Sequence, residues 1–216
     1  MPSKQRDRQR QPGRRKPSRD PKRRLLVVCE GEVTERGYIL GLQRHLSNPA
    51  LEVVIPRKHG DPLHLVQEAK KYFLQASNES RRSGDSLVRF DEVWCIFDRD
   101  QHERFDDACQ MARDNHFHLA VSNPCFELWI LLHFRESPGA RHRKEVVTLV
   151  REFLPSYGKY IEFAKLAPSI DQAVERAQRL ETACIEEGLP AFSNPSTGFY
   201  SLVQSMQQDA EHLLRT

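Results

Sequence analysis

The sequence lacks the short motifs that mark several large enzyme classes. It contains no P-loop, no GxGxxG glycine pattern, no HExxH zinc motif and no GxSxG nucleophile motif. These absences argue against a nucleoside triphosphatase, a dinucleotide-dependent enzyme, a zinc protease and a serine hydrolase. The chain also shows no internal repeat, so it is not expected to be a solenoid.

Long apolar runs and closely spaced cysteines are missing as well. No apolar run approaches the ~20 residues of a membrane span, and the N-terminus has no apolar stretch of the kind found in secretory signals. The five cysteines show no CxxC spacing, which favours reduced, buried thiols over disulfides or zinc. With 38% hydrophobic and 29% charged residues among 216, we expect a cytoplasmic protein with one sizeable core.

Residues 1–24 differ from the rest of the chain in charge. They hold eleven Lys and Arg against two Asp, a net charge of +9, whereas the remainder holds 22 against 28 acids, a net of −6. The segment has no aliphatic residue after Met1, so it cannot bury a core and is expected to be disordered. It would tether nucleic acid through counterion release, or serve only as a solubilising tail.

Apolar patterning predicts four strands that alternate with four helices in an α/β core over residues 25–134. The strands are expected at 25–29, 52–55, 92–97 and 118–122, and the helices at 35–46, 62–76, 103–115 and 125–134. Asp61 and Pro62 predict the start of the second helix, Pro124 is placed at the start of the fourth, and residues 77–90 are expected to form a surface loop. The alternation implies a parallel sheet flanked by helices.

The remainder, residues 135–216, is expected to be a helical C-terminal extension packed on that core. Helices are predicted at 143–154, 169–187 and 199–214. Ser169 and Gln172 match a capping box, and residues 194–198 are read as a turn or helix entry.

Two of the predicted buried strands end in acidic residues. Glu30 follows the first, while Asp98 and Asp100 follow the third. The carboxyl ends of parallel strands meet at the edge where ligands bind, and residues two apart on an extended backbone point to the same side. Carboxylates suit Mg²⁺ or Mn²⁺, so we expect these three residues to hold metal and act in phosphodiester hydrolysis. Alternatively, the aspartates cap a helix or pair with arginine.

Each of the other candidate residues has two possible roles, one structural and one functional. Glu32 and Glu35 stand at a helix entry that Thr34 would cap, or Glu35 joins the site. Glu127 is the sole acid in an apolar helix, where it either caps the helix or completes the catalytic site, since a buried carboxylate needs a partner. His133 is expected to be a structural histidine, with a catalytic base as the alternative.

Substrate binding has four candidate residues. Arg57 and Lys58 follow the second strand, and Asn123 follows the fourth. Lys159 lies in a loop that enters the C-terminal helices. Because basic side chains on loops are usually just solvated, each is a weak candidate taken alone.

Four motifs together resemble the RloB-like proteins. They are residues 27–35 (VVCEGEVTE), 96–100 (IFDRD), 122–134 (SNPCFELWILLHF) and 194–197 (NPST). The resemblance spans about residues 24–205 and implies a Toprim-like fold, a prokaryotic source, and a locus shared with an RloA ATPase and associated with phage defence. It also implies that Glu30 matches the strand-one glutamate of Toprim nucleases and that Asp98 and Asp100 match their DxD pair.

Three functions are consistent with these observations. The expected one is a Mg²⁺- or Mn²⁺-dependent nuclease acting on DNA or on RNA such as tRNA, as the effector of an ATPase-coupled antiviral or abortive-infection system. The second is a non-catalytic regulatory module that docks on an RloA-like ATPase. The third is nucleotidyl or phosphotransfer chemistry on a small nucleotide.

Overall fold

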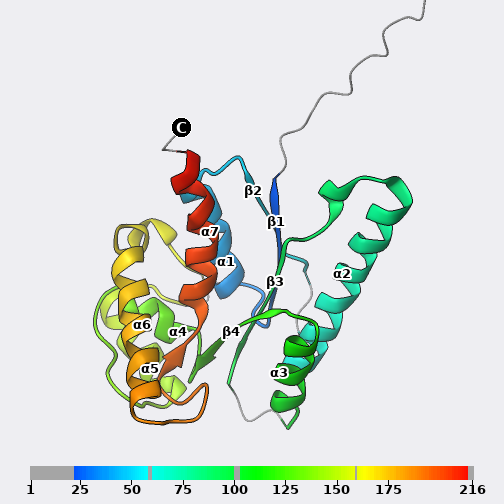
Figure 1. The fold of residues 1–216 in the computed structure, drawn as a ribbon. Coiled ribbons are helices and arrows are strands. Elements are labelled where there is room, and N and C mark those ends of the chain that lie inside the picture. The colour runs from blue at the N-terminus through cyan, green and yellow to red at the C-terminus, as the bar shows by residue number, and fades with distance from the viewer. Residues whose placement is uncertain (1–21, 58–59, 100–102, 159, 214–216) are drawn as a thin grey trace, which may run out of the picture.

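The computed structural model describes residues 22–57, 60–99, 103–158 and 160–213 (Figure 1). The predictions for Lys58, Asp100, Lys159 and residues 1–21 lie outside this part of the chain. Its elements are β1 (Arg23–Cys29), α1 (Thr34–Leu46), β2 (Leu51–Val54), α2 (Pro62–Ser83), η1 (Ser86–Val88), β3 (Glu92–Asp98), α3 (Phe105–Asp114), β4 (His118–Asn123), α4 (Glu127–Leu132), α5 (Arg143–Phe153), η2 (Phe163–Lys165), η3 (Ala167–Ser169), α6 (Ile170–Glu186), β5 (Ser196–Thr197) and α7 (Phe199–Leu213).

The strands form one sheet in the order β2-β1-β3-β4-β5. Strands β1 to β4 are mutually parallel, and β5 runs antiparallel to β4. From β1 the chain passes to β2 on one side and then to β3 on the other, so the carboxyl ends of β1 and β3 adjoin at a topological switch point. The predicted α/β fold, a Rossmann-like parallel sheet flanked by helices, is confirmed.

Helices cover both faces of the sheet (Figure 1). Leu25, Val27 and Cys29 of β1 enter the core that packs on α1, α4, α5, α6 and α7, while Leu26 and Val28 enter the core beneath α2 and α3. Strands buried on both faces read as continuous apolar runs, which is why β1 and β3 could be located from sequence. In the described part of the chain, no helix is long and apolar enough to cross a bilayer.

Helix α2 is longer than its apolar stripe predicts. The side chain of Asp61 accepts hydrogen bonds from the backbone N–H groups of Leu63 and His64, as expected of an N-cap. The helix then continues to Ser83, so the surface loop expected at 77–90 is wrong for residues 77–83. The added turns are largely exposed, and they end at Gly84, whose φ of 70° closes the helix in the left-handed conformation that glycine adopts readily.

Two predicted helix starts are wrong in detail, and a third helix lacks its predicted cap bond. Val33 occupies the N-cap of α1 in place of Thr34, without a side-chain cap bond. Ser169 stands at the N-cap position of α6 as predicted, but its hydroxyl makes no cap bond and donates to the carbonyl of Leu166 at 3.2 Å. Helix α4 begins at Glu127, three residues after Pro124, since the amide of Leu128 bonds back only three residues in a 3₁₀ manner.

Residues 194–198 contain a strand that the turn interpretation did not anticipate. Thr197 pairs with Ser122 across β5 and β4, and their hydroxyls lie 2.8 Å apart. A Cβ on Gly198 would lie 3.4 Å from the carbonyl oxygen of Leu119, so β5 approaches β4 closely there. The C-terminal extension is therefore not wholly helical, and it adds a strand to the sheet.

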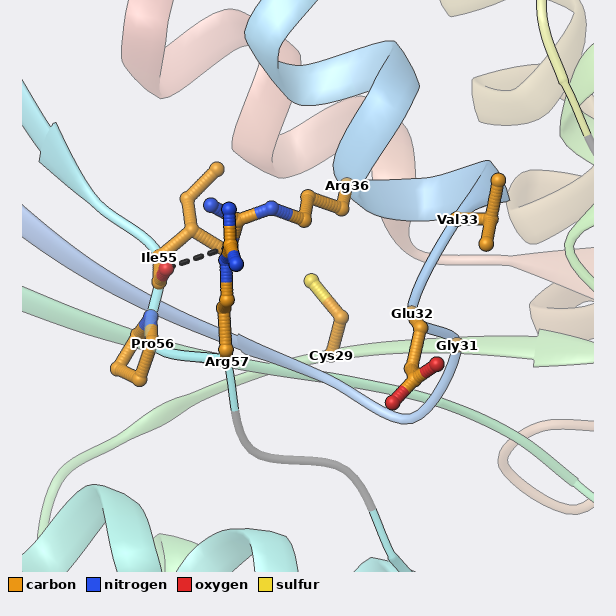
Figure 2. A pocket seen from close by; sticks show the side chains of 8 residues that line it. All are labelled: Cys29, Gly31, Glu32, Val33, Arg36, Ile55, Pro56 and Arg57. Carbon is orange, nitrogen blue, oxygen red and sulfur yellow. Dashed lines mark hydrogen bonds between the residues drawn. The ribbon is translucent and has the colours of Figure 1, made fainter.

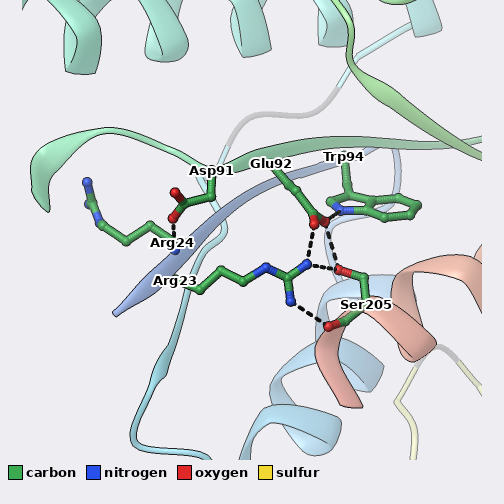
Figure 3. Close-up of polar contacts among 6 residues, drawn as sticks. All are labelled: Arg23, Arg24, Asp91, Glu92, Trp94 and Ser205. Carbon is green, nitrogen blue, oxygen red and sulfur yellow. Dashed lines mark hydrogen bonds and ion pairs between the residues drawn. The ribbon is translucent and has the colours of Figure 1, made fainter. Parts of the chain in front are cut away.

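A polar network joins the amino ends of β1 and β3 to α7 (Figure 3). Arg23 forms an ion pair with Glu92 and donates to the carbonyl oxygen of Ser205 at 2.7 Å. The other carboxylate oxygen of Glu92 accepts from Trp94 Nε1 and from the Ser205 hydroxyl, each at 2.7 Å. Both central strands are thus fixed to the C-terminal extension at the edge opposite their carboxyl ends.

Two glycines of α1 provide a matched test of how the C-terminal extension packs. A Cβ on Gly41 would lie 2.4 Å from Phe163 in η2, whereas a Cβ on Gly37 would meet nothing within 4 Å. We expect Gly41→Ala to lower the free energy of unfolding by about 1–3 kcal/mol through overpacking. Gly37→Ala should instead raise it by roughly 0.5–1 kcal/mol. Urea unfolding measures both, and equal shifts would contradict the packing described.

Candidate functional site

Four acidic side chains gather at the carboxyl edge of the sheet, and we call them the acid cluster: Glu30, Glu35, Asp98 and Glu127. Asp98 ends β3, and the three glutamates come from the residue after β1, the first turn of α1 and the start of α4. Each glutamate is close enough to raise the pKa of Asp98 by its charge. The fold therefore unites residues that are spread over almost 100 positions of the sequence.

Strand pairing sets the position of Glu30 against Asp98. Cys29 pairs with Ile96 in the β1–β3 register, and the backbone N–H of Glu30 donates to the carbonyl of Ile96 at 2.9 Å. The side chain of Glu30 then turns back and accepts from the backbone N–H of Asp98 at 3.1 Å. Two of the three residues predicted as metal ligands, Glu30 and Asp98, are thus in direct contact at the switch point.

Asp98 is the most deeply buried member of the acid cluster, with 5% of its surface exposed. Burial is the main cause that raises its pKa well above the ordinary value, and the guanidinium of Arg143 opposes this. Arg143 forms an ion pair with Asp98 from the first residue of α5, and 42% of its side chain is exposed. Sequence reasoning missed Arg143, because no local pattern marks a partner that lies 45 residues away.

Glu35 is also buried, with 7% of its surface exposed. Burial raises its pKa, hydrogen bonds from its own backbone N–H and from that of Gly31 lower it, and the charges of Glu127 and Glu30 raise it again. A Cβ on Gly31 would lie 2.0 Å from the Glu35 carboxylate, so a side chain at position 31 would displace that carboxylate. Glu35 thus bonds the amides at the helix entry and also belongs to the acid cluster.

Glu127 is half-buried and bonded to the C-terminal extension. Its Oε1 accepts a hydrogen bond from the Tyr157 hydroxyl at 3.1 Å. Burial, and secondarily the charge of Glu127, raise the pKa of Tyr157, so the phenol remains a proton donor. Tyr157 follows α5, close to the loop in which Lys159 was predicted to bind substrate. It is a second residue at this edge that sequence reasoning missed.

His133 lies in the core with partners other than the acid cluster. Its Nε2 is 3.0 Å from the Tyr38 hydroxyl, and its Nδ1 is 3.0 Å from the carbonyl oxygen of Leu166. Burial lowers its pKa to about 4, so the imidazole is neutral at pH 7. It then donates from Nδ1 to Leu166 and accepts from Tyr38. These contacts support the structural interpretation over the catalytic one.

The two described candidates for substrate binding differ in position. The side-chain amide of Asn123 donates to the carbonyl oxygen of Phe192 at 2.6 Å, so it holds the loop that leads to β5. Arg57 is exposed and lines a cavity of about 360 Å³ beside β1 and α1 (Figure 2). Arg36 lines the same cavity and was not singled out from the sequence.

The acid cluster has the type of side chain that binds a hard divalent cation, but these side chains are not arranged as a metal site. Carboxylate oxygens are the donors that Mg²⁺ and Mn²⁺ prefer, and a cation would offset the mutual repulsion of four acids. Within the described residues, however, no group of three His, Cys, Asp or Glu side chains is already placed as metal ligands. Arg143 occupies one carboxylate oxygen of Asp98. A metal ion that used this oxygen would have to displace the guanidinium.

Most of the chain matches a known protein family. The family model described as RloB-like protein matches residues 25–206. The chain belongs to the RloB-like family. The match includes every member of the acid cluster, and it confirms the resemblance inferred from the four motifs. Comparisons with curated proteins and with solved structures give no match.

The buried charge of Glu35 should make stability depend on pH. Its pKa is higher in the folded than in the unfolded chain, so the stability that it contributes is complete below the unfolded value of 4.5 and is lost as pH rises through the folded pKa. We expect Glu35→Gln to raise the melting temperature at neutral pH, with a gain that shrinks on acidification. Thermal unfolding between about pH 4 and pH 8 measures this.

The exposed Glu32, three residues before Glu35, gives the matched control for this experiment. Glu32→Gln should leave the pH profile of the wild type almost unchanged. A Glu35→Gln variant that is no more stable than the wild type at neutral pH would contradict the assignment of a buried charge.

Proposed function

We propose that this RloB-like protein is a divalent-metal-dependent phosphodiesterase acting on nucleic acid. The observation that carries the proposal is the acid cluster, in which three glutamates surround a buried Asp98 at the switch point of the sheet. Placing like charges around a buried carboxyl group lowers the stability of the fold. Groups whose pKa values are perturbed in this way concentrate at functional sites. Resemblance to the DxD pair of Toprim nucleases supports the same role.

In this proposal Glu30 and Asp98, together with Asp100, hold Mg²⁺ or Mn²⁺. The ion would polarise a phosphoryl oxygen and lower the pKa of its bound water. Glu127 completes the site, and its bond with Tyr157 fixes the direction of its carboxylate. Glu35, whose pKa is raised by burial, is suited to hold a proton and deliver it to the leaving oxygen.

Arg143 takes two positions in this scheme. Without metal, its guanidinium neutralises Asp98. A cation bound in its place would free the side chain, whose planar fork suits a substrate phosphate. The same ion pair also favours a second candidate function, a regulatory module without catalysis, because it already satisfies the buried carboxylate.

The resemblance to RloB-like proteins supports a choice of substrate and partner. We propose DNA or RNA, including tRNA, as substrate, and an RloA-like ATPase as the partner that controls the protein in antiviral defence. The net charge of +9 over residues 1–24 suits binding to a polyanion. Phosphotransfer on a small nucleotide would use the same acids and stays a third candidate.

Metal binding should be lost when Asp98 is changed. Saturating Mn²⁺ at about 100 times its Kd should stabilise the wild type by about 2.7 kcal/mol, and Asp98→Asn should abolish that gain. Asp106→Asn, which changes an exposed acid on α3, is the control and should behave as wild type. Thermal unfolding measures binding, and cleavage of tRNA and DNA is followed in the same samples. Cleavage that persists in chelator would overturn the proposal.

Removing Arg143 should make the protein more dependent on metal. In chelator, Arg143→Gln should cost about 2 kcal/mol, less than the ~3–5 kcal/mol of a fully buried pair because the arginine is 42% exposed. Added Mn²⁺ should then stabilise the variant more than the wild type, since no guanidinium competes for Asp98. Calorimetric titration compares the two Kd values. An unchanged Kd would show that Arg143 and metal do not share the carboxylate.

A further inference from the structure

The cavity beside the acid cluster is formed by three segments. The loop from β1 to α1 contributes Glu32 and Val33, α1 contributes Arg36, and the chain after β2 contributes Ile55 and Arg57 (Figure 2). Its volume of about 360 Å³ lies within the range of sites that enclose small molecules. It opens at the same edge of the sheet as the acid cluster, because the loop that lines it begins at Glu30.

Two guanidinium groups give this cavity its charge. Nη1 of Arg36 donates to the carbonyl oxygen of Ile55 at 2.6 Å, which holds the side chain across the cavity wall. Arg57 reaches toward the same end of the cavity in Figure 2. Within the described part of the chain, neither arginine has an ion pair with a carboxylate. Two arginines that share a cavity in this way are suited to bind an anion, and planar guanidinium groups bind phosphate with two parallel bonds.

The other lining residues suit a ligand that is larger than a simple anion. Ile55 and Pro56 supply apolar surface beside the arginines, and Val33 supplies it at the other end of the cavity (Figure 2). Such surface packs against a ribose or a base. Glu32 lies at the end away from the arginines in Figure 2, so a phosphate would occupy the arginine end. The cavity therefore matches a ligand with a phosphate group and an attached ring system.

We propose that this cavity binds one nucleotide unit, with its phosphate on Arg36 and Arg57 and its sugar or base against Val33, Ile55 and Pro56. This inference rests on the proposed function for its biological meaning: a strand whose scissile phosphate lies on the acid cluster places a neighbouring nucleotide in the cavity. The binding itself needs no metal, because the arginines supply the charge that the phosphate requires.

The test measures binding of the four ribonucleoside 5′-monophosphates to the full chain by calorimetry in the presence of chelator. Wild type should bind at least one of them in the millimolar range or tighter. Arg57→Gln and Arg36→Gln should each weaken binding by about tenfold or more, the effect of losing a charge-assisted hydrogen bond. Arg89→Gln, at an exposed arginine before β3, is the matched control and should bind as wild type does.

Two further arms separate this inference from the proposed function. Asp98→Asn should keep nucleotide binding, since the acid cluster takes no part in it, so metal binding and nucleotide binding can fail independently. Inorganic phosphate and the free nucleoside should each bind more weakly than the nucleotide. The inference is overturned if no mononucleotide binds, if the two arginine variants bind as tightly as wild type, or if inorganic phosphate binds equally well.

Discussion

The site depends on the pairing of β1 with β3 at the centre of the sheet. Both strands are buried on both faces, so their register cannot shift without moving side chains out of two cores. That register places Glu30 directly against the end of β3, where its carboxylate accepts from the backbone of Asp98. The packing of β1 and β3 in the two cores therefore holds the acids together against the repulsion between their charges. In this way the fold preorganises the site.

The C-terminal extension completes this edge. Arg143 at the start of α5 neutralises Asp98, and Tyr157 after α5 orients Glu127. His133 links α1 to this extension by bonding Tyr38 on one side and Leu166 on the other. Histidine is common in catalysis, but His133 holds the scaffold together. Arg143 and Tyr157, which contact Asp98 and Glu127, come from the region that the sequence predicted only as packed helices.

Sequence patterns could predict the features that depend on neighbouring residues. The apolar runs of β1 and β3 and the acids at their ends are local signals, so the fold class and the contact of Glu30 with Asp98 could be inferred. Arg143 has no such signal, because only the folded chain brings it to Asp98. The strand β5 is two residues long and depends on pairing with β4. Ser169 matched a capping box and does stand at the N-cap of α6, but its side chain makes no cap bond there.

The account stands on one claim, that the acid cluster is a metal site which Arg143 occupies in the absence of metal. A crystal structure grown with Mn²⁺, with anomalous scattering recorded from the metal, tests it most directly. The account predicts an anomalous peak bound by Asp98 and Glu30, with the Arg143 guanidinium turned away from Asp98. Crystals soaked in Mn²⁺ that show no peak at this edge, with the ion pair between Arg143 and Asp98 intact, would contradict it.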